Sequence, residues 1–202
     1  NYGYWSGDNR NHDNDAKWEL YNDGTLNIHD GNLADGSTEY GWLAYGMHTD
    51  NLNNSDVKTI NLSNVYDNHS FYGLFEGLPN LTAINGLTTV NFEPGNIWTV
   101  AAMFAYDPKL TSIVLPSLHL PNGATDNPDN MFHGDNGLKY LDVSNANLNN
   151  AQTLDGFIQS DNSLVYIKVG NIDTSKETRS DTWDEAGHES FASVAKADAT
   201  DP

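Results

Sequence analysis

The residues that could perform chemistry in this chain are few and scattered. The segment His188-Glu189-Ser190-Phe191-Ala192 begins like the zinc motif H-E-x-x-H, but alanine stands in the place of the second histidine. That motif needs two imidazoles one helical turn apart, so His188 is interpreted as a surface residue. The sequence contains no G-x-S-x-G nucleophile motif, no phosphate-binding glycine loop and no EF-hand spacing. We therefore predict that the protein is not an enzyme.

Loop carboxylates offer a second kind of chemistry. Asp13 and Asp15, and Asp126 with Asp129, carry oxygen ligands of the type that calcium prefers. Runs of Asp and Asn also make turns by bonding to their own backbone, and this is the interpretation we favour. We expect no cofactor and no metal, with calcium at these loops as the alternative.

Composition narrows the possible partners. The 202 residues contain 9 Lys and Arg against 28 Asp and Glu, a formal net charge of −19. A polyanion repels nucleic acid and anionic membrane surfaces, so neither is an expected partner. Cysteine is absent, which excludes disulfides, thiolate zinc sites and cysteine nucleophiles. No apolar run approaches the length of a membrane span. Because the chain begins Asn-Tyr-Gly without a leader, it is interpreted as a processed form or a piece of a longer protein. It is also expected to be a monomer.

The elements that must position any site follow from an internal repeat. Within residues 98–115, apolar side chains at i, i+3 and i+4 predict one face of a short helix (Val100, Met103 and Phe104). A proline then ends the helix, and the phrase L-x-x-I-x-L over 110–115 predicts a short strand. Neither half can bury its apolar face alone, so each needs neighbours of the same kind.

The sequence supplies those neighbours. An apolar pair followed six residues later by a strand leucine occurs four times: Leu74-Phe75, Met103-Phe104, Met131-Phe132 and Phe157-Ile158. Periods of this length carrying L-x-x-L-x-L are typical of leucine-rich repeats. The predicted fold is an α/β solenoid, a right-handed coil with one short strand and one short helix per 24–29-residue repeat.

Three regions are expected along one continuous domain. Residues 1–56 form a lead-in and an N-terminal β-hairpin cap, because Asn22-Asp23-Gly24 is a turn signal between two alternating segments. Residues 57–170 hold the leucine-rich repeats. Residues 171–202 are interpreted as a degenerate capping repeat and tail.

These features resemble one family. The chain resembles BspA-like leucine-rich-repeat bacterial surface proteins in four features. They are the hairpin W-x-L-x-x-D-G-T-L-x-I-x-x-G over Trp18 to Gly31, the pairs Met103-Phe104 and Met131-Phe132, the strand Leu138-Lys-Tyr-Leu141-Asp142-Val143-Ser144, and the segment Ile172-Asp173-Thr174-Ser175. The resemblance covers residues 18–190. It implies an extracellular protein of the lactobacillus type, attached to the cell wall through regions outside this chain and involved in adhesion to a host.

Strand geometry predicts where a partner would bind. In L-x-x-L-x-L the third and fifth positions point out of the sheet, opposite to the core leucines. The outward positions of the last three strands are the predicted partner-binding residues: Ser112, Val114, Tyr140, Asp142, Tyr166 and Lys168. Tyr140 beside Tyr166 is expected to be the centre of this surface, since tyrosine gives rigid amphipathic contact area. Cross-strand packing of the two rings is the structural alternative.

The predicted function is a non-enzymatic cell-surface adhesion module. Its expected partner is a host protein or glycoprotein, such as mucin, collagen or fibronectin, bound through the sheet face. Two alternatives remain open. One is a structural spacer that presents another adhesive domain, and the other is a carbohydrate-binding domain that uses Trp5, Trp42 or Trp98.

Overall fold

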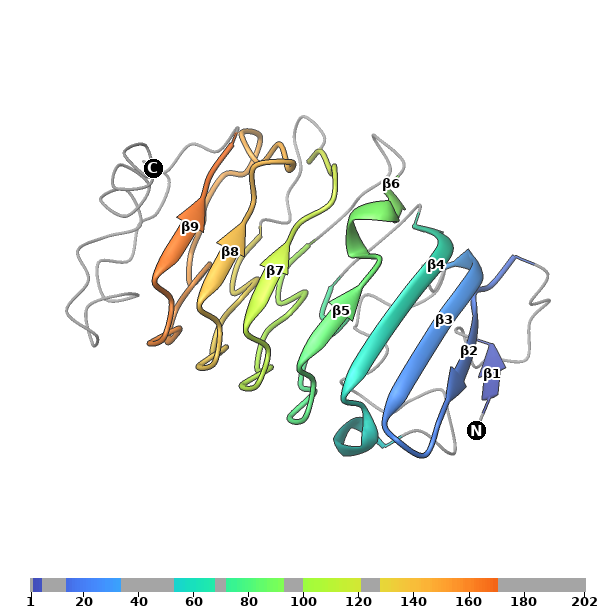
Figure 1. The fold of residues 1–202 in the computed structure, drawn as a ribbon. Helices are drawn as coiled ribbons and strands as arrows, with labels where there is room; N and C mark the ends of the chain where they lie inside the picture. Colours follow the sequence, from blue (N-terminus) through green and yellow to red (C-terminus); the bar gives the residue numbers. More distant parts are fainter. Residues whose placement is uncertain are drawn as a thin grey trace.

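Strands and turns make up the described chain. The computed structural model describes residues 2–4, 14–33, 53–67, 72–92, 100–120 and 128–170. Within these ranges the strands lie in two sheets, with six strands in one and three in the other. Figure 1 shows β3, β4, β5, β7, β8 and β9 following one another side by side across the molecule.

The first sheet is mixed. Its main path is β1-β2-β3-β4-β5, with β6 paired to β4. β1, β2 and β3 pair antiparallel, whereas β3, β4 and β5 pair parallel. The strands and the two accompanying 3-10 helices are β1 (Tyr2–Tyr4), β2 (Lys17–Leu20), β3 (Thr25–Asn32), η1 (Asn54–Asp56), β4 (Thr59–Asp67), β5 (Ala83–Asn85), η2 (Leu87–Thr89) and β6 (Asn91–Phe92).

β2 and β3 form the hairpin that the Asn-Asp-Gly turn predicts. Gly24 takes a φ of 92°, which only glycine adopts readily. The Asp23 carboxylate accepts the backbone N–H of Thr25 at 2.9 Å, so the turn is closed by its own side chain. Trp18, Leu26 and Ile28 point from the hairpin into the core.

The second sheet is parallel and fully in register. It contains β7 (Ser112–Val114), β8 (Tyr140–Asp142) and β9 (Tyr166–Lys168). The middle residues of the three strands are Ile113, Leu141 and Ile167, and all three are buried. One apolar residue per strand therefore fixes the register, because a slip by one residue would turn it to solvent.

The segments predicted as helices are turns. The described residues contain no α-helix, and residues 101–106 and 129–134 are turns. Left-handed backbone conformations occur four residues apart in each, at Ala102 and Tyr106 and again at Asn130 and Gly134. A residue with positive φ interrupts the right-handed helical path, so a regular helix cannot form there.

Hydrogen bonds between successive turns replace those of the predicted helices. The N–H groups of Ala102, Phe104 and Tyr106 donate to carbonyls of the next turn at 2.9, 2.9 and 2.8 Å. Donation from every second residue is the pattern of an extended chain, not of a helix. The i, i+3, i+4 spacing of apolar residues was therefore misleading: these side chains are buried by stacking against the next turn.

The core lies between the strands and these turns. Phenylalanine rings form a column through it, with centroids 5.7 Å apart for Phe75 and Phe104, 5.4 Å for Phe104 and Phe132, and 5.1 Å for Phe132 and Phe157. All four rings are buried. Packing of this density makes each turn depend on its neighbours.

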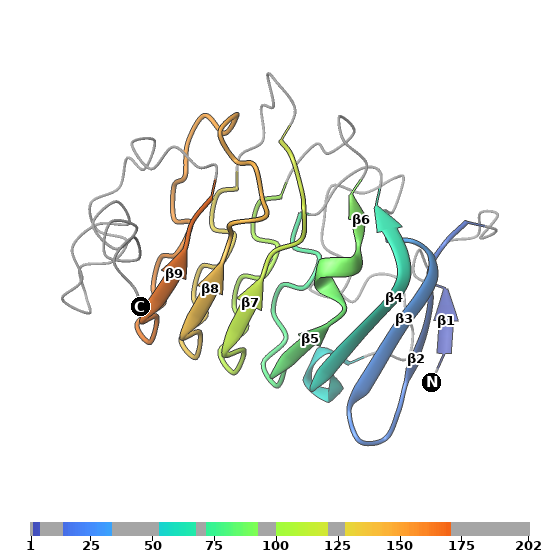
Figure 2. The ribbon, with the colours of Figure 1, turned by 45° about the horizontal axis from the view of Figure 1, so that its top comes forward.

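The prediction of an α/β solenoid with one helix per repeat is wrong. Strands predominate, the predicted helices are turns, and the strands form two separate sheets instead of one continuous sheet. In the described part of the chain no backbone hydrogen bond joins β5 to β7. After β5 the chain makes the left-handed turn at Gly86 and then η2, and this detour coincides with the break between the sheets (Figure 2). The predicted boundaries at residues 56 and 170 are not tested, and residues 171–202 lie outside the described residues.

Candidate functional site

The six predicted partner-binding residues lie together on β7, β8 and β9. Ser112 pairs with Tyr140 and Val114 with Asp142, and these pair in turn with Tyr166 and Lys168. Ser112 and Lys168 are exposed, whereas Val114, Tyr140 and Tyr166 are half-buried. We call these six residues the tyrosine face.

The two tyrosines form the centre of the tyrosine face. Their ring centroids lie 4.8 Å apart and their planes differ by 4°. This is the separation of neighbouring strands, so the parallel register alone brings the rings face to face. Two rings held in this way form a rigid platform with polar hydroxyl tips.

Asp142 occupies an outward position of β8 beside Lys168, but its side chain is buried and not exposed as the alternation predicts. Only 6% of the residue is exposed. Its Oδ1 accepts hydrogen bonds from the backbone N–H and the hydroxyl of Ser144, at 2.9 and 2.6 Å. Its Oδ2 lies 3.2 Å from the Lys168 ammonium. Burial disfavours the charged carboxylate, but the Ser144 hydrogen bonds and then Lys168 outweigh it, so the pKa of Asp142 lies below its ordinary value. Asp142 therefore holds Lys168 in place, and its own contact with a partner stays a prediction.

The same face of the first sheet carries a different pattern. Asn85 donates from its side-chain amide to Asn61 at 2.8 Å, and Asn61 donates to Asn27 at 2.9 Å. These residues face one another in the parallel register of β3, β4 and β5. We call them the asparagine ladder. Two amide N–H groups are thus used between strands and stabilise the sheet, whereas the Asn85 side chain stays exposed.

A groove separates the two patterns. It has a volume of about 280 Å³ and lies between β5, η2 and β7. Its walls are Ile84, Asn85, Gly86, Leu87 and Thr88 on one side, and Ser112, Ile113 and Val114 on the other. The groove contains no charged side chain, and two of its lining residues, Ser112 and Val114, also belong to the tyrosine face. Sequence reasoning missed it because the repeat predicted an unbroken sheet.

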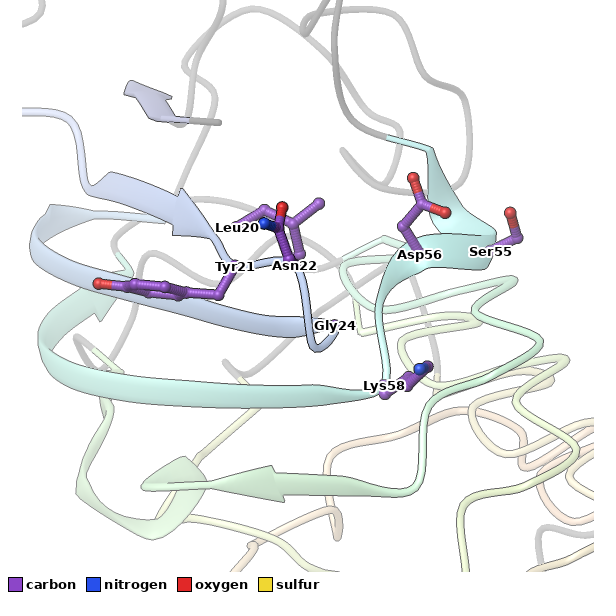
Figure 3. A pocket seen from close by; sticks show the side chains of 7 residues that line it. All are labelled: Leu20, Tyr21, Asn22, Gly24, Ser55, Asp56 and Lys58. Atoms are coloured by element: carbon purple, nitrogen blue, oxygen red, sulfur yellow. The ribbon is translucent and has the colours of Figure 1, made fainter.

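A second pocket lies beside the β2–β3 hairpin. It has a volume of about 340 Å³ between the hairpin turn and η1, and Leu20, Tyr21, Asn22, Gly24, Ser55, Asp56 and Lys58 line it. Figure 3 shows Asp56 and Lys58 on one side, and the Tyr21 ring directed away from them. Gly24 approaches the Asp56 carbonyl so closely that a Cβ atom would lie 2.8 Å from it. The pocket is thus a seam between two tightly packed turns and brings no catalytic pair together.

Three buried acidic residues were also missed. Asp107, Asp135 and Asp161 occupy equivalent places after successive turns and are almost fully buried. The sequence does contain a signal, since each stands three residues before a strand leucine in the pattern D-x-x-L. Aspartate before such a leucine is more often a turn residue at the surface, so the signal was not interpreted as burial.

Several predicted chemical groups fall outside the described residues: Trp5, Asp13, Trp42, Trp98, Asp126 and His188. Of the proposed calcium ligands, Asp15 lies in a bridge to Asn32, and Asp129 lies in the turn before Met131. No three His, Cys, Asp or Glu side chains within the described ranges are grouped so that they could hold a metal ion.

Comparisons with known proteins do not place the chain in a family. No family model matches it, no curated protein matches it and no solved structure matches it. The resemblance to BspA-like surface proteins therefore rests only on the residues given above and stays a prediction. No helix in the described part of the chain has the length and apolarity required to cross a membrane.

Proposed function

We propose that the protein is a non-enzymatic binding module that uses the tyrosine face to hold a host protein or glycoprotein at the bacterial cell surface. The observation that carries the proposal is the parallel pair Tyr140 and Tyr166, held 4.8 Å apart and partly open to solvent. Aromatic anchors of this kind dominate the energy of many protein interfaces.

The surroundings of the pair support a contact role. Lys168 is half exposed, with 49% of its side chain accessible, and Asp142 fixes it from below. An oriented ammonium beside aromatic rings favours a partner that presents carbonyl groups to it. The uncharged groove between β5 and β7 continues the surface beyond Ser112 and Val114, which gives room for an apolar side chain of that partner.

The extracellular location and the host partner come from the resemblance to BspA-like proteins. The net charge of −19 fits a partner that is basic or neutral and argues against nucleic acid. A spacer that only presents another domain remains the competing function, and the experiment below separates the two.

The test is binding of the chain to immobilised mucin, collagen, fibronectin and fibrinogen at low and high salt. We expect Tyr140→Ala/Tyr166→Ala to weaken binding at least tenfold, because losing two anchors removes about 2 kcal/mol or more. Circular dichroism establishes that the variant is folded. Tyr106→Ala is the matched control, because Tyr106 is 54% exposed on a turn away from the tyrosine face.

The other outcomes are equally informative. Binding that survives the double substitution but fades with salt would move the site to the acidic surface. Binding lost equally in the Tyr106 control would indicate a general effect of removing tyrosines. No binding to any of the four partners would favour the spacer.

A further inference from the structure

Three aspartates form a buried column along the turns. Asp107 and Asp135 are 0% exposed and Asp161 is 5% exposed. They follow successive turns that stack on one another through backbone hydrogen bonds. We call these three residues the aspartate ladder. Carboxylates are almost never buried so completely unless they are paired with a cation.

Each ladder residue uses one oxygen to tie its turn to the turn before it. Asp107 Oδ1 accepts the backbone N–H of Leu78 at 2.7 Å. Asp135 Oδ1 accepts the N–H of Asp107 at 2.7 Å, and Asp161 Oδ1 accepts the N–H of Asp135 at 2.8 Å. The ladder is therefore a continuous series of links from the last turn back to the first.

The second oxygen of each carboxyl is buried away from the protein's other polar groups. The Oδ2 atoms of Asp107, Asp135 and Asp161 are all buried and have no hydrogen-bond partner. An ionised carboxylate in this position is removed from bulk solvent, and its Oδ2 gains no hydrogen bond in exchange. That costs several kcal/mol per group, whereas a protonated carboxyl avoids most of the penalty.

The charged neighbours make ionisation harder still. The charges that act on Asp107 and Asp135 come from Glu76 and from the other ladder residues, and all are acidic. Glu76 itself has a buried Oε2 without a partner, and burial raises its pKa. Burial first, and like charges second, raise the pKa of Asp107 and Asp135, and burial raises that of Asp161.

We propose that the aspartate ladder is a proton-dependent lock on the turn layer. At mildly acidic pH the three carboxyls hold their protons and the turns stay stacked. As the pH rises the carboxyls ionise, repel one another and weaken the stack between residues 72 and 161. The free energy of unfolding is thus highest at mildly acidic pH, whatever partner the tyrosine face binds.

The sign of the effect follows from proton linkage. A carboxyl with a higher pKa in the folded chain binds more protons there than in the unfolded chain, where its pKa is about 3.9. Stability is therefore unaffected below that value and falls as the pH rises toward the folded pKa. Each such carboxyl lowers the folding equilibrium constant up to about tenfold per pH unit within this window.

One further group titrates close to the ladder. His133 lies in the turn between Asp129 and Asp135 and packs edge-on against Tyr106, with ring centroids 5.1 Å apart. Burial lowers its pKa, so its own contribution has the opposite sign and destabilises the fold as the pH falls. Comparing variants that all retain His133 cancels this contribution.

The experiment is urea unfolding of the full chain between pH 5 and pH 7.5. We compare the unchanged chain with Asp107→Asn/Asp135→Asn/Asp161→Asn, because asparagine keeps the Oδ1 acceptor and cannot ionise. We expect the folding constant of the unchanged chain to fall at least tenfold between pH 5 and pH 7. The triple variant should keep only the contributions of Glu76 and His133 to this dependence, and it should be the more stable protein at pH 7. The charge-matched control is Glu19→Gln/Asp23→Asn/Asp56→Asn, which removes three exposed carboxylates and should keep the original slope.

Three results would overturn the lock: an unchanged chain whose stability does not fall with pH, a triple variant with the original slope, or stabilisation at pH 7 by calcium chloride that matches the triple substitution. The last would mean that a cation, not a proton, neutralises the ladder. If the triple variant does not fold, carbon-13 NMR of the carboxyls in the unchanged chain decides the matter. Three aspartates still protonated at pH 6 support the lock, and titration of every aspartate below pH 5 overturns it.

Discussion

The two sheets use equivalent strand positions for different purposes. On β3, β4 and β5 the outward fifth position is asparagine, and the three amides bond in sequence along the sheet. On β7, β8 and β9 the same position is Val114, Asp142 and Lys168, and the third position carries the stacked tyrosines. The first sheet links its outward amides to one another, whereas the second leaves aromatic and cationic groups partly exposed.

This difference shows that a repeated backbone does not imply a repeated role. Side chains that bond to one another along the sheet stabilise it at the expense of external contacts. A face of stacked rigid rings that is only half-buried offers a partner aromatic contact area. The break between β5 and β7 separates the two patterns, so each can change without disturbing the register of the other.

The largest effect is expected from removing the Phe104 ring, which packs between a turn of the first sheet and a turn of the second. Phe104 stacks on Phe75, which precedes β5, and on Phe132, which precedes β8. We expect Phe104→Ala to lower the free energy of unfolding by about 3–5 kcal/mol, because it leaves a cavity in a fully packed core. Urea unfolding measures this. Phe157→Ala, whose ring meets only Phe132 among the four rings of the column, should cost less. An equal loss would mean that the column does not couple the sheets.

The next largest effect should come from the detour between the sheets. Gly86 has a φ of 80°, and a Cβ atom there would overlap the backbone carbonyl oxygen of Leu62 on β4. We expect Gly86→Ala to cost about 2–3 kcal/mol, since both backbone strain and a clash with main chain must be relieved. Thermal unfolding tests this. Gly77→Ala is a useful control, because its φ is also positive but the space around it is open.

Removal of Asp142 should test the support of the tyrosine face. Asp142→Ala leaves Lys168 without its partner and is expected to cost about 1–3 kcal/mol at neutral pH. The pKa of Asp142 is lowered on folding, so its contribution is present above pH 4 and is lost as the pH falls through the folded pKa. The difference from the unchanged chain should thus shrink as the pH falls below 4. A constant difference would indicate that packing, not charge, is responsible.

The smallest effect is expected in the asparagine ladder. Asn61→Ala removes both of its inter-strand amide bonds at once, at a cost of about 1 kcal/mol. It should not change partner binding, because the ladder lies on the other sheet. A drop in affinity with normal stability would show that the binding surface extends across the groove to β4. Surface plasmon resonance and urea unfolding together separate these outcomes.

Much of the strand layer could be predicted from the sequence. The phrases over 57–62, 110–115, 138–143 and 164–169 identify their buried residues, and two-residue periodicity places Tyr140 beside Tyr166 once the strands are in register. The hairpin followed from Asn22-Asp23-Gly24. Local patterns are reliable here because strand alternation and turn chemistry act over a few residues.

The turn layer could not be predicted in the same way. The spacing of Val100, Met103 and Phe104 fits a helix, but Ala102 and Tyr106 adopt left-handed conformations that only stacking against the next turn can stabilise. Asp142 likewise alternates as an exposed residue, yet Ser144 and Lys168 draw it inward. The turn conformations and the contact with Lys168 depend on residues 26 or more positions away, whereas Ser144 is only two positions from Asp142.

The sequence by itself determined the repeat, its acidic charge and the residues that alternate along each strand, because these depend only on composition and local spacing. Tertiary structure alone decided that the intervening segments are turns, that the sheet is broken after β5, and that three aspartates are buried in the interior. The physical reason is the same in each case. When the next turn accepts a backbone N–H, that hydrogen bond stabilises a conformation that the isolated segment would not adopt.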